Sequence, residues 1–344
     1  MFDWSIYDEE LIYNVHKFIP EIDLCSEKEI LDIIDDIISA NKKYLVTYNE
    51  YFLYNFYGAS DSIRQTFIPK CQFKKTISNS LDRKFVCTYI SKYDCYKTFK
   101  KYFKRDAIKV ENFDDYNEFK RFVSKHKKYI IKENDGSLGA NISVVNVKEN
   151  DNIKDLFFYA LQYGGCIIEE YLTQDPVFAA FNESSLNTVR LTTVYENGKV
   201  DYLYSLAIFG KKNYIVNNGG QGGIISLVNP MTGEVISDGY TEDLEKYIEH
   251  PDSHLAIKGF CIPKWDELLK IAEELAVKAK GVTVLGWDFA LTDRGWAVIE
   301  ANTQPSAFPI QMLMAQTLGR GIREEYEAMI GKYKDTKKNF EYEE

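Results

Sequence analysis

The sequence lacks the cysteine and histidine patterns that hold disulfide frameworks or zinc ions. No two cysteines form a Cys-x-x-Cys pair, and the four histidines show no zinc-type spacing. We therefore expect reduced thiols and no structural zinc. The six cysteines are scattered along the chain: Cys25, Cys71, Cys87, Cys95, Cys166 and Cys261.

Long apolar runs are also missing. The opening stretch, MFDWSIYDEE, is acidic and lacks the basic region followed by an apolar region that marks a secretory signal. Nowhere does the sequence contain an uninterrupted apolar run long enough to span a bilayer. We expect no integral membrane segment and a cytoplasmic protein.

The sequence contains fewer basic than acidic residues. The chain has 42 Lys and Arg against 52 Asp and Glu, which gives a net charge of -10. Nucleic-acid binding needs a basic surface that neutralises phosphates, so we expect no nucleic-acid partner, although the balance leaves room for a local basic pocket. Hydrophobic residues at 45% and charged residues at 27% are typical of a folded protein, and 344 residues suffice for two or three domains.

No internal repeat is present, so the organisation has to come from local patterns. In SEKEILDIIDDIISANK, Ser26 and Glu29 predict a capping box at the start of an amphipathic helix. Patterns typical of strands begin at about residue 105, and Asn197-Gly198 predicts the type I′ turn of a hairpin. We predict a helix-rich α/β domain over residues 1–105 and α+β subdomains over 106–175 and 176–344.

The stretch GWDFALTDRGWAVIEANTQP, residues 286–305, predicts a hairpin that carries acidic residues. A three-residue loop, Asp293 to Gly295, would place Thr292 opposite Trp296 and Asp288 opposite Glu300. Asn302 would share a face with Glu300, because side chains two apart on a strand point the same way. Facing carboxylates require a cation, and two carboxylates with an amide oxygen suit Mg²⁺. The alternative is that these are solvated acids near strand ends.

Three further groups suggest contacts to a nucleotide. Lys132 precedes a loop in which Gly136, Ser137 and Gly139 could fold backbone N–H groups around phosphates. The loop leads into a strand, unlike a Walker A loop, and an ordinary turn is the alternative. Arg190 lies on the polar face of NTVRLTTV, and the apolar run IIEEYL ends in two glutamates. A salt-bridged arginine and a strand reaching solvent are the alternatives for these two.

The order of these groups resembles the nucleotide-binding residues of the ATP-grasp superfamily, and more narrowly the sugar-transfer-associated ATP-grasp proteins. The resemblance covers about residues 48 to 320, and its last two stretches are the most specific. The matching stretches are YNEYFLYNFYGAS, SKYDCYKTFKKYFKR, IIKENDGSLGANI, NTVRLTTV, HPDSHLAIKGFCIPKWDELLKIAEELA and LGWDFALTDRGWAVIEANTQP.

This resemblance implies an ATP-grasp fold, in which an N-terminal α/β domain precedes two α+β subdomains that clamp ATP between antiparallel sheets. Residues 106–175 would form the small lid subdomain and residues 176–344 the catalytic subdomain. Lys132 and Lys92 would be the phosphate-binding lysines. The family's acid before the second lysine is replaced by Ser91 here, which leaves Lys97 as an alternative to Lys92.

The resemblance also implies roles for the remaining residues. Arg190 would face the γ-phosphate and the acyl phosphate, with Asn187 nearby, and Asp175 would bind the ribose. NTQPS departs from the Pro-Gly pair that often follows the metal-binding Asn, and residues 219–223 resemble a substrate-covering loop, although a surface loop is equally compatible. The adenine hinge would be Glu169, Glu170, Tyr171 and Leu172, and the magnesium ligands would be Asp288, Glu300 and Asn302.

From this resemblance we expect a carboxylate-amine ligase that uses ATP and Mg²⁺ and forms an amide through an acyl phosphate. The partners implied are small-molecule carboxylate and amine substrates, for example a uronic acid or a nucleotide sugar in surface polysaccharide biosynthesis. A homodimer is an open alternative to a monomer. The alternatives for function are a phosphotransferase on the same fold and a non-catalytic nucleotide-binding partner of a polysaccharide assembly complex.

Overall fold

The computed structural model describes residues 2–135, 142–212 and 222–330. The chain forms two compact units, one made of residues 1–78 and 306–344 and the other of residues 79–305. These bounds differ from those of the three domains predicted from the sequence, because the C-terminal helices join the N-terminal unit. The three-domain division stays a prediction about how the chain is organised for function.

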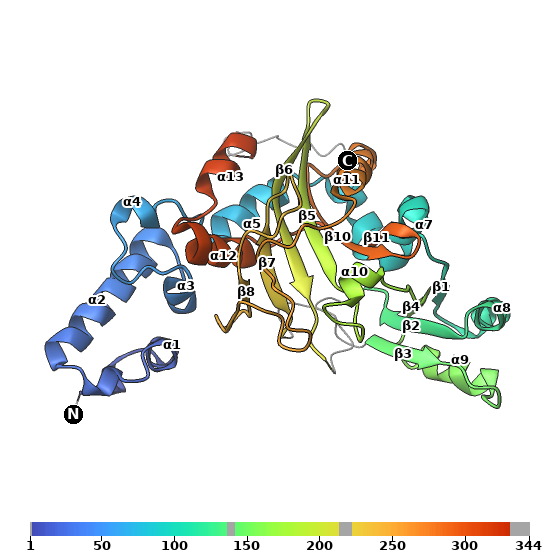
Figure 1. The fold of residues 1–344 in the computed structure, drawn as a ribbon, viewed down its shortest axis with the longest axis horizontal. Coiled ribbons are helices and arrows are strands. Elements are labelled where there is room, and N and C mark those ends of the chain that lie inside the picture. The colour runs from blue at the N-terminus through green and yellow to red at the C-terminus, as the bar shows by residue number, and fades with distance from the viewer. Residues whose placement is uncertain (1, 136–141, 213–221, 331–344) are drawn as a thin grey trace, which may run out of the picture. The chain divides into compact units, whose positions relative to one another are not determined.

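The regular elements in the described part of the first unit are helices (Figure 1). The predicted capping box is confirmed, since the Ser26 N–H donates to a Glu29 carboxylate oxygen at 2.8 Å at the start of α2. The helices are η1 (Trp4–Ile6), α1 (Glu9–Phe18), η2 (Ile22–Leu24), α2 (Glu27–Tyr44), α3 (Tyr48–Leu53), α4 (Asp61–Arg64), α5 (Lys70–Asn79, ending at the boundary), α12 (Phe308–Leu318) and α13 (Arg323–Met329).

The N-terminal stretch contains less β-structure than the predicted α/β domain. Within the described part of residues 1–105 the elements are helical, and the β pairing there is one isolated bridge, between Leu81 and Val282. The aromatic run after residue 47, which has the composition of a strand, instead forms helix α3, because Thr47 and Glu50 make a second capping box. The cap therefore outweighs the β-propensity of the aromatic residues.

The second unit contains two antiparallel sheets, as the predicted fold requires. The smaller sheet has strand order β1-β4-β2-β3. Helices α8 and α9 cover one face of it (Figure 1), where Phe119, Phe122 and Phe157 pack on the apolar strand residues. The bounds are β1 (Ala107–Val110), η4 (Phe113–Asp115), α8 (Tyr116–Lys125), β2 (Lys128–Glu133), β3 (Ile142–Asn146), α9 (Ile153–Leu161) and β4 (Cys166–Glu170).

The larger sheet has strand order β11-β10-β5-β6-β7-β8-β9. The predicted Asn197-Gly198 turn is confirmed, with φ of 51° and 82° between β5 and β6. The bounds are β5 (Thr188–Glu196), β6 (Lys199–Phe209), β7 (Ile224–Val228), β8 (Gly239–Tyr240), β9 (Lys246–Tyr247), β10 (Val284–Thr292) and β11 (Gly295–Asn302), with helices η3 (Arg83–Phe85), α6 (Val86–Ile90), α7 (Lys92–Phe103), α10 (Pro176–Ala179) and α11 (Trp265–Lys278).

One face of the larger sheet is buried and the other carries the polar side chains of interest. Helices α7 and α11 contribute to the core on the buried face, where the Phe99 ring meets the edge of Trp287 with centroids 5.3 Å apart. Phe289 and Val298 belong to the same core. Because alternate residues point to opposite faces, Asp288 lies on the face opposite to Trp287 and Phe289.

None of the helices in the described part of the chain combines the length and the apolar composition that a bilayer-spanning helix requires.

Candidate active site

Three charged side chains form a row across the face of the larger sheet that lies opposite to Trp287 and Phe289. Asp288 on β10 pairs with Arg190 on β5 and with Glu300 on β11. Residues that are directly opposite in antiparallel strands have side chains on the same face, so the three lie side by side. The predicted pairing of Asp288 with Glu300 is therefore confirmed.

A β-bulge produces this pairing, and the predicted hairpin loop is wrong. Thr292 pairs with Gly295 instead of Trp296, so the loop has two residues, Asp293 and Arg294. The register then shifts between Asp288 and Phe289, which leaves Ile299 as an extra residue in β11. The loop is one residue shorter than predicted and the bulge adds one residue to β11, so Asp288 still pairs with Glu300. Without the bulge, strict alternation would turn Glu300 toward the buried core.

The row is electrostatically unbalanced. Arg190 grips Asp288 with two parallel hydrogen bonds, from Nε to Oδ1 at 2.7 Å and from Nη2 to Oδ2 at 2.8 Å. The Asp288 charge raises the pKa of Arg190 further above its ordinary value. Burial, and secondarily the Asp288 charge, raises the pKa of the Glu300 carboxyl, although that side chain still reaches solvent.

The residues at this end of the hairpin fit a hard divalent cation. Asn302 pairs with Gly286 at the position two beyond Glu300, and its Oδ1 accepts a hydrogen bond from the Gln304 N–H at 2.9 Å. Each Asp288 oxygen accepts one bond from Arg190 and keeps a second lone pair. Asp288, Glu300 and Asn302 thus bring carboxylate and amide oxygens, the ligands that suit Mg²⁺, to the same end of the hairpin.

Lys132 is held by a buried ion pair. Its Nζ lies 2.5 Å from Oε2 of Glu169, and Nη2 of Arg105 lies 2.5 Å from the other oxygen. Burial acts to raise the pKa of Glu169, but the two cations outweigh it and lower the pKa to about 2. The predicted adenine-hinge residue Glu169 is thus engaged by the predicted phosphate lysine.

Arg105 is a buried residue that the sequence reasoning missed. It lies between α7 and β1, and it also donates from Nη1 to the Val298 carbonyl at 2.6 Å and from Nη2 to the Ile299 carbonyl at 3.3 Å. These carbonyls flank the bulge. Arg105 ends the matching stretch SKYDCYKTFKKYFKR, but no pattern within that stretch predicts this role for it.

The two predicted phosphate lysines lie near the acidic row. The charges of Lys92 and Lys132 both act on the Glu300 carboxyl and oppose the rise of its pKa. The alternative residue, Lys97, pairs instead with Asp94 at 2.8 Å on the exposed side of α7. The phosphate role of Lys92, with Lys97 as its alternative, stays a prediction.

Asn134 is a second residue that the sequence reasoning missed. Its carbonyl accepts from the N–H of Lys92 at 3.0 Å, and its side-chain oxygen accepts from the N–H of Tyr93 at 3.0 Å. Asn134 thus ties the end of β2 to the start of the helix that carries Lys92. The predicted loop residues Gly136, Ser137 and Gly139, and residues 219–221 of the predicted covering loop, lie outside the described residues.

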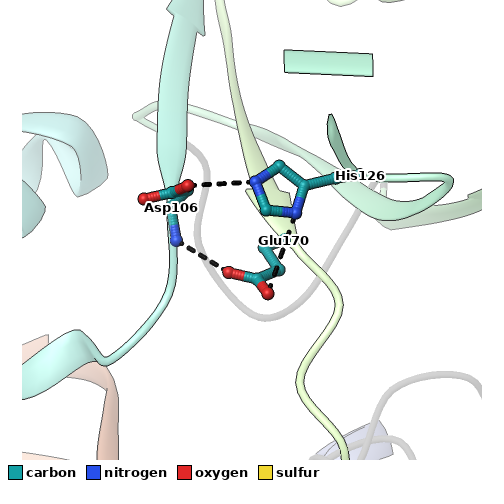
Figure 2. A group of neighbouring side chains, drawn as sticks. All are labelled: Asp106, His126 and Glu170. Carbon is teal, nitrogen blue, oxygen red and sulfur yellow. Dashed lines mark hydrogen bonds and ion pairs between the residues drawn. The ribbon is translucent and has the colours of Figure 1, made fainter. Parts of the chain in front are cut away.

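The hinge residue Glu170 belongs to a cluster with Asp106 and His126 (Figure 2). The imidazole lies between the two carboxylates, 3.0 Å from Asp106 and 3.7 Å from Glu170. Lys125 pairs with Asp106, and Arg294 binds Glu170 at 2.5 and 3.1 Å. Since these cations already compensate both carboxylates, we read the cluster as structural.

The other predicted binding residues are placed in different ways. Tyr171 is partly exposed, with the Lys128 ammonium 3.5 Å from its ring centroid, and Leu172 is buried. Asp175 caps helix α10 by accepting from the N–H of Val177 at 3.0 Å, and Lys264 lies 3.9 Å from its carboxylate. Both ribose-binding and adenine-binding roles stay predictions.

Asn187 is fully buried, and its amide is saturated with protein partners. Its Nδ2 donates to the carbonyl of Phe178 at 2.7 Å and to Gln174 Oε1 at 2.9 Å, while its Oδ1 accepts from the N–H of Gly210 at 3.0 Å. An amide used in this way orders the chain around the start of β5. Its predicted catalytic role stays untested.

Comparison with protein families identifies the chain. The model of the family described as sugar-transfer associated ATP-grasp matches residues 62–325, which is more than half of the chain. The chain belongs to this ATP-grasp family. The match covers all the predicted site residues, from Lys92 to Asn302. No curated protein matches the chain.

Solved structures with similar folds have low sequence identity to this ATP-grasp protein. They include D-alanyl-alanine synthetase A from Vibrio cholerae (12% identity, 74% of this chain and 67% of that chain, TM-score 0.47) and D-alanine–D-alanine ligase from Bacillus anthracis complexed with ATP (14%, 71% and 65%, 0.41). A third is the ATP-grasp ligase PsnB complexed with a minimal precursor (13%, 72% and 62%, 0.41). The chain thus matches about two thirds of their lengths.

Proposed function

We propose that this ATP-grasp protein is a carboxylate-amine ligase that forms an amide at the expense of ATP. The observation that carries the proposal is the row of Arg190, Asp288 and Glu300 on one face of the sheet, with the charges of Lys92 and Lys132 acting on the same end of it. Cations for phosphates and oxygen ligands for a metal are thereby gathered at one place. Membership of the family supports the same reading.

The reaction proposed has two steps. An oxygen of the substrate carboxylate bonds to the γ-phosphorus of ATP while the bond to the ADP oxygen breaks. The amine nitrogen of the second substrate then attacks the carbonyl carbon of the acyl phosphate, inorganic phosphate leaves, and the nitrogen releases a proton. Neither step requires a nucleophile from the protein, so the protein contributes positioning and electrostatic stabilisation.

The side chains divide this work. Lys132, held in place by Glu169, and Lys92, at the start of α7, bind phosphate oxygens. Arg190 uses two of its five N–H groups on Asp288, so the remaining three can donate to the transferred phosphate. Mg²⁺ bound by Asp288, Glu300 and Asn302 would supply charge stabilisation to the phosphates. Asn187 and Asn134 position the chain around these groups.

The proposed substrates are an acidic sugar, such as a uronic acid, and an amino acid or amine, joined in surface polysaccharide biosynthesis in the cytoplasm. The family description, sugar-transfer associated, supports the sugar. Which of the two substrates supplies the carboxylate is decided by the experiment below.

Incubation with MgATP, hydroxylamine and pooled uronic acids and amino acids, followed by mass spectrometry, tests the proposal. A hydroxamate formed together with ADP would establish an acyl phosphate and name the carboxylate. ADP with a stable phosphorylated product would show a phosphotransferase instead. Tight MgATP binding without turnover in any pool would favour a non-catalytic nucleotide-binding partner.

A further inference from the structure

We propose that Arg105 is a positioning residue that sets the geometry of the metal ligands through the bulge of β11. The inference rests on the proposed function, because it concerns the proposed magnesium site. Arg105 is the last residue of the matching stretch SKYDCYKTFKKYFKR, but the resemblance implies no role for it, and its side chain is 2% exposed. Its role follows from what its guanidinium contacts.

The guanidinium of Arg105 joins three parts of the second unit. It binds the Glu169 carboxylate of β4 at 2.5 Å, the Val298 carbonyl at 2.6 Å and the Ile299 carbonyl at 3.3 Å. The contact to Glu169 is a buried, charge-assisted pair. The other two end on the backbone of β11 at the place where its register shifts.

The bulge decides which way Glu300 points. Val298 packs in the core, so a regular strand would direct Ile299 outward and Glu300 inward. The extra residue turns Glu300 to the face of Asp288 and returns Ala301 to the core. The bulge lies on β11, the edge strand of the larger sheet, so buried carbonyls there have no further strand to bond and need donors from elsewhere. Arg105 supplies these donors.

The same guanidinium connects the metal strand to the phosphate lysine. Glu169 accepts Arg105 on one oxygen and Lys132 on the other. A planar fork can serve a carboxylate and two carbonyls at once, whereas the single ammonium of a lysine cannot reproduce that set of directions. Arg105→Lys therefore keeps a positive charge beside Glu169 but loses the hydrogen bonds to the Val298 and Ile299 carbonyls at the bulge.

Arg294 offers a matched control. It also ties β4 to the β10–β11 hairpin, since it binds Glu170, but it does so from the hairpin loop and its side chain is 47% exposed. An exposed ion pair of this kind contributes little. Arg294→Lys thus makes the same chemical change on the same hairpin, away from the bulge.

The test compares wild type, R105K and R294K by Mn²⁺ binding in the presence of ADP, followed by electron paramagnetic resonance, and by ADP affinity without metal. We expect R105K to weaken Mn²⁺ binding by about 10- to 100-fold, as for other residues that orient metal ligands. Metal-free ADP affinity should stay within about threefold, a split that general destabilisation would not produce. R294K should resemble wild type in both measurements. R105K binding Mn²⁺ like wild type would overturn the inference.

Hydrogen exchange on the wild-type protein provides a second test that needs no folded variant. Mn²⁺ and ADP together should slow exchange in residues 298–301 and in residues 104–107 alike, because Arg105 couples the two segments. Protection of residues 298–301 alone would overturn the role of Arg105. If wild-type protein bound no Mn²⁺ at all, the proposed metal site itself would fail, and the role of Arg105 with it.

Discussion

Glu169 is a single carboxylate that compensates two cations, Lys132 and Arg105. Removing its charge leaves the buried Arg105 and the partly buried Lys132 without the carboxylate that compensates them, which is costlier than losing an exposed pair. Its sequence context, an apolar strand ending in two glutamates, predicts only a position at the end of a strand. The partners come from 37 and 64 residues away in the sequence, distances that no local pattern reports.

We predict that Glu169→Gln lowers the free energy of unfolding at pH 7 by about 3–5 kcal/mol. The folded-state pKa of Glu169, about 2, lies below its ordinary value of 4.5, so its contribution is fully present above pH 4.5 and is lost as the pH falls toward 2. Urea denaturation should therefore show the gap between the variant and wild type narrowing below pH 4.5. A gap unchanged down to pH 2.5 would contradict this account.

Arg190 is predicted to act mainly in turnover. Replacing it with Ala should reduce kcat by about 10²–10³-fold, since it removes a preorganised donor to the transferred phosphate. The dissociation constant of ATP should change far less, because Lys92 and Lys132 remain. Steady-state kinetics and equilibrium nucleotide binding check the two effects separately, and full turnover in the variant would rule out the assigned role.

Lys92 and Lys97, the two candidate phosphate lysines of helix α7, can be distinguished by the nucleotide binding of alanine variants. Lys92→Ala should weaken ATP binding at least tenfold, on the order of one charge-assisted contact of 1.5–3 kcal/mol. Lys97→Ala should leave binding within about twofold, because Lys97 pairs with Asp94 at the surface. Calorimetric titration with ATP distinguishes them, and the reverse ranking would transfer the phosphate role to Lys97.

At the scale of elements, the hairpin β10–β11 shows where sequence patterns succeed and fail. Alternation and the glycine at position 295, whose φ is 83°, predict the hairpin and its acidic face. The pattern cannot reveal the bulge, since the extra residue, Ile299, is an ordinary strand residue. A loop predicted one residue too long and a bulge left unpredicted cancel, so the facing pair of carboxylates is still predicted.

Gly286 provides an element-scale prediction. A Cβ added there would lie 3.2 Å from Cβ of Pro305 and 3.7 Å from Cβ of Asn302, tighter than ordinary packing in the first case. Gly286→Ala should therefore shift Pro305, and with it the chain that follows Asn302, and so weaken Mn²⁺ binding, with a stability loss of about 1–3 kcal/mol from overpacking. Electron paramagnetic resonance titration and thermal unfolding measure the two effects.

Gly295→Ala is the matched control on the same hairpin. Its positive φ makes the substitution cost about 1–2 kcal/mol, yet the residue lies at the loop end, away from Asn302. Equal loss of metal affinity in the two glycine variants would mean that general destabilisation, and not displacement of Asn302, is responsible.

At the scale of the whole molecule, the two compact units have different bounds from the three domains predicted from the sequence. Periodicity predicts individual helices and strands, while the order of the motifs carries the resemblance to ATP-grasp proteins, and that resemblance implies the antiparallel sheets. Periodicity does not predict that residues 306–344 join the N-terminal unit, because that depends on contacts between segments far apart in sequence. One such contact is the Gln311 side chain, which bonds both backbone groups of Ile68 at 2.7 and 3.0 Å.

The fragment of residues 79–305 should fold and bind nucleotide by itself. It is one continuous compact unit, and it contains every proposed ligand from Lys92 to Asn302. We expect a cooperative thermal transition that shifts upward with MgATP, by mass action on the folded state. A fragment that melts without cooperativity would show that the flanking unit is needed for folding.

The first unit is assembled from both ends of the chain, with consequences for biosynthesis. When residues 2–78 leave the ribosome, the helices that complete their packing have yet to be translated. The Phe67 and Ile68 carbonyls then still lack the hydrogen bonds that Arg323 and Gln311 donate in the folded protein. The Thr76 hydroxyl still lacks the hydrogen bond from Tyr326. The intervening residues 79–305 form a compact unit of their own and can reach their native state first. Residues 2–78 are thus translated before the helices that complete their packing, so their apolar side chains stay incompletely packed while residues 79–305 are made.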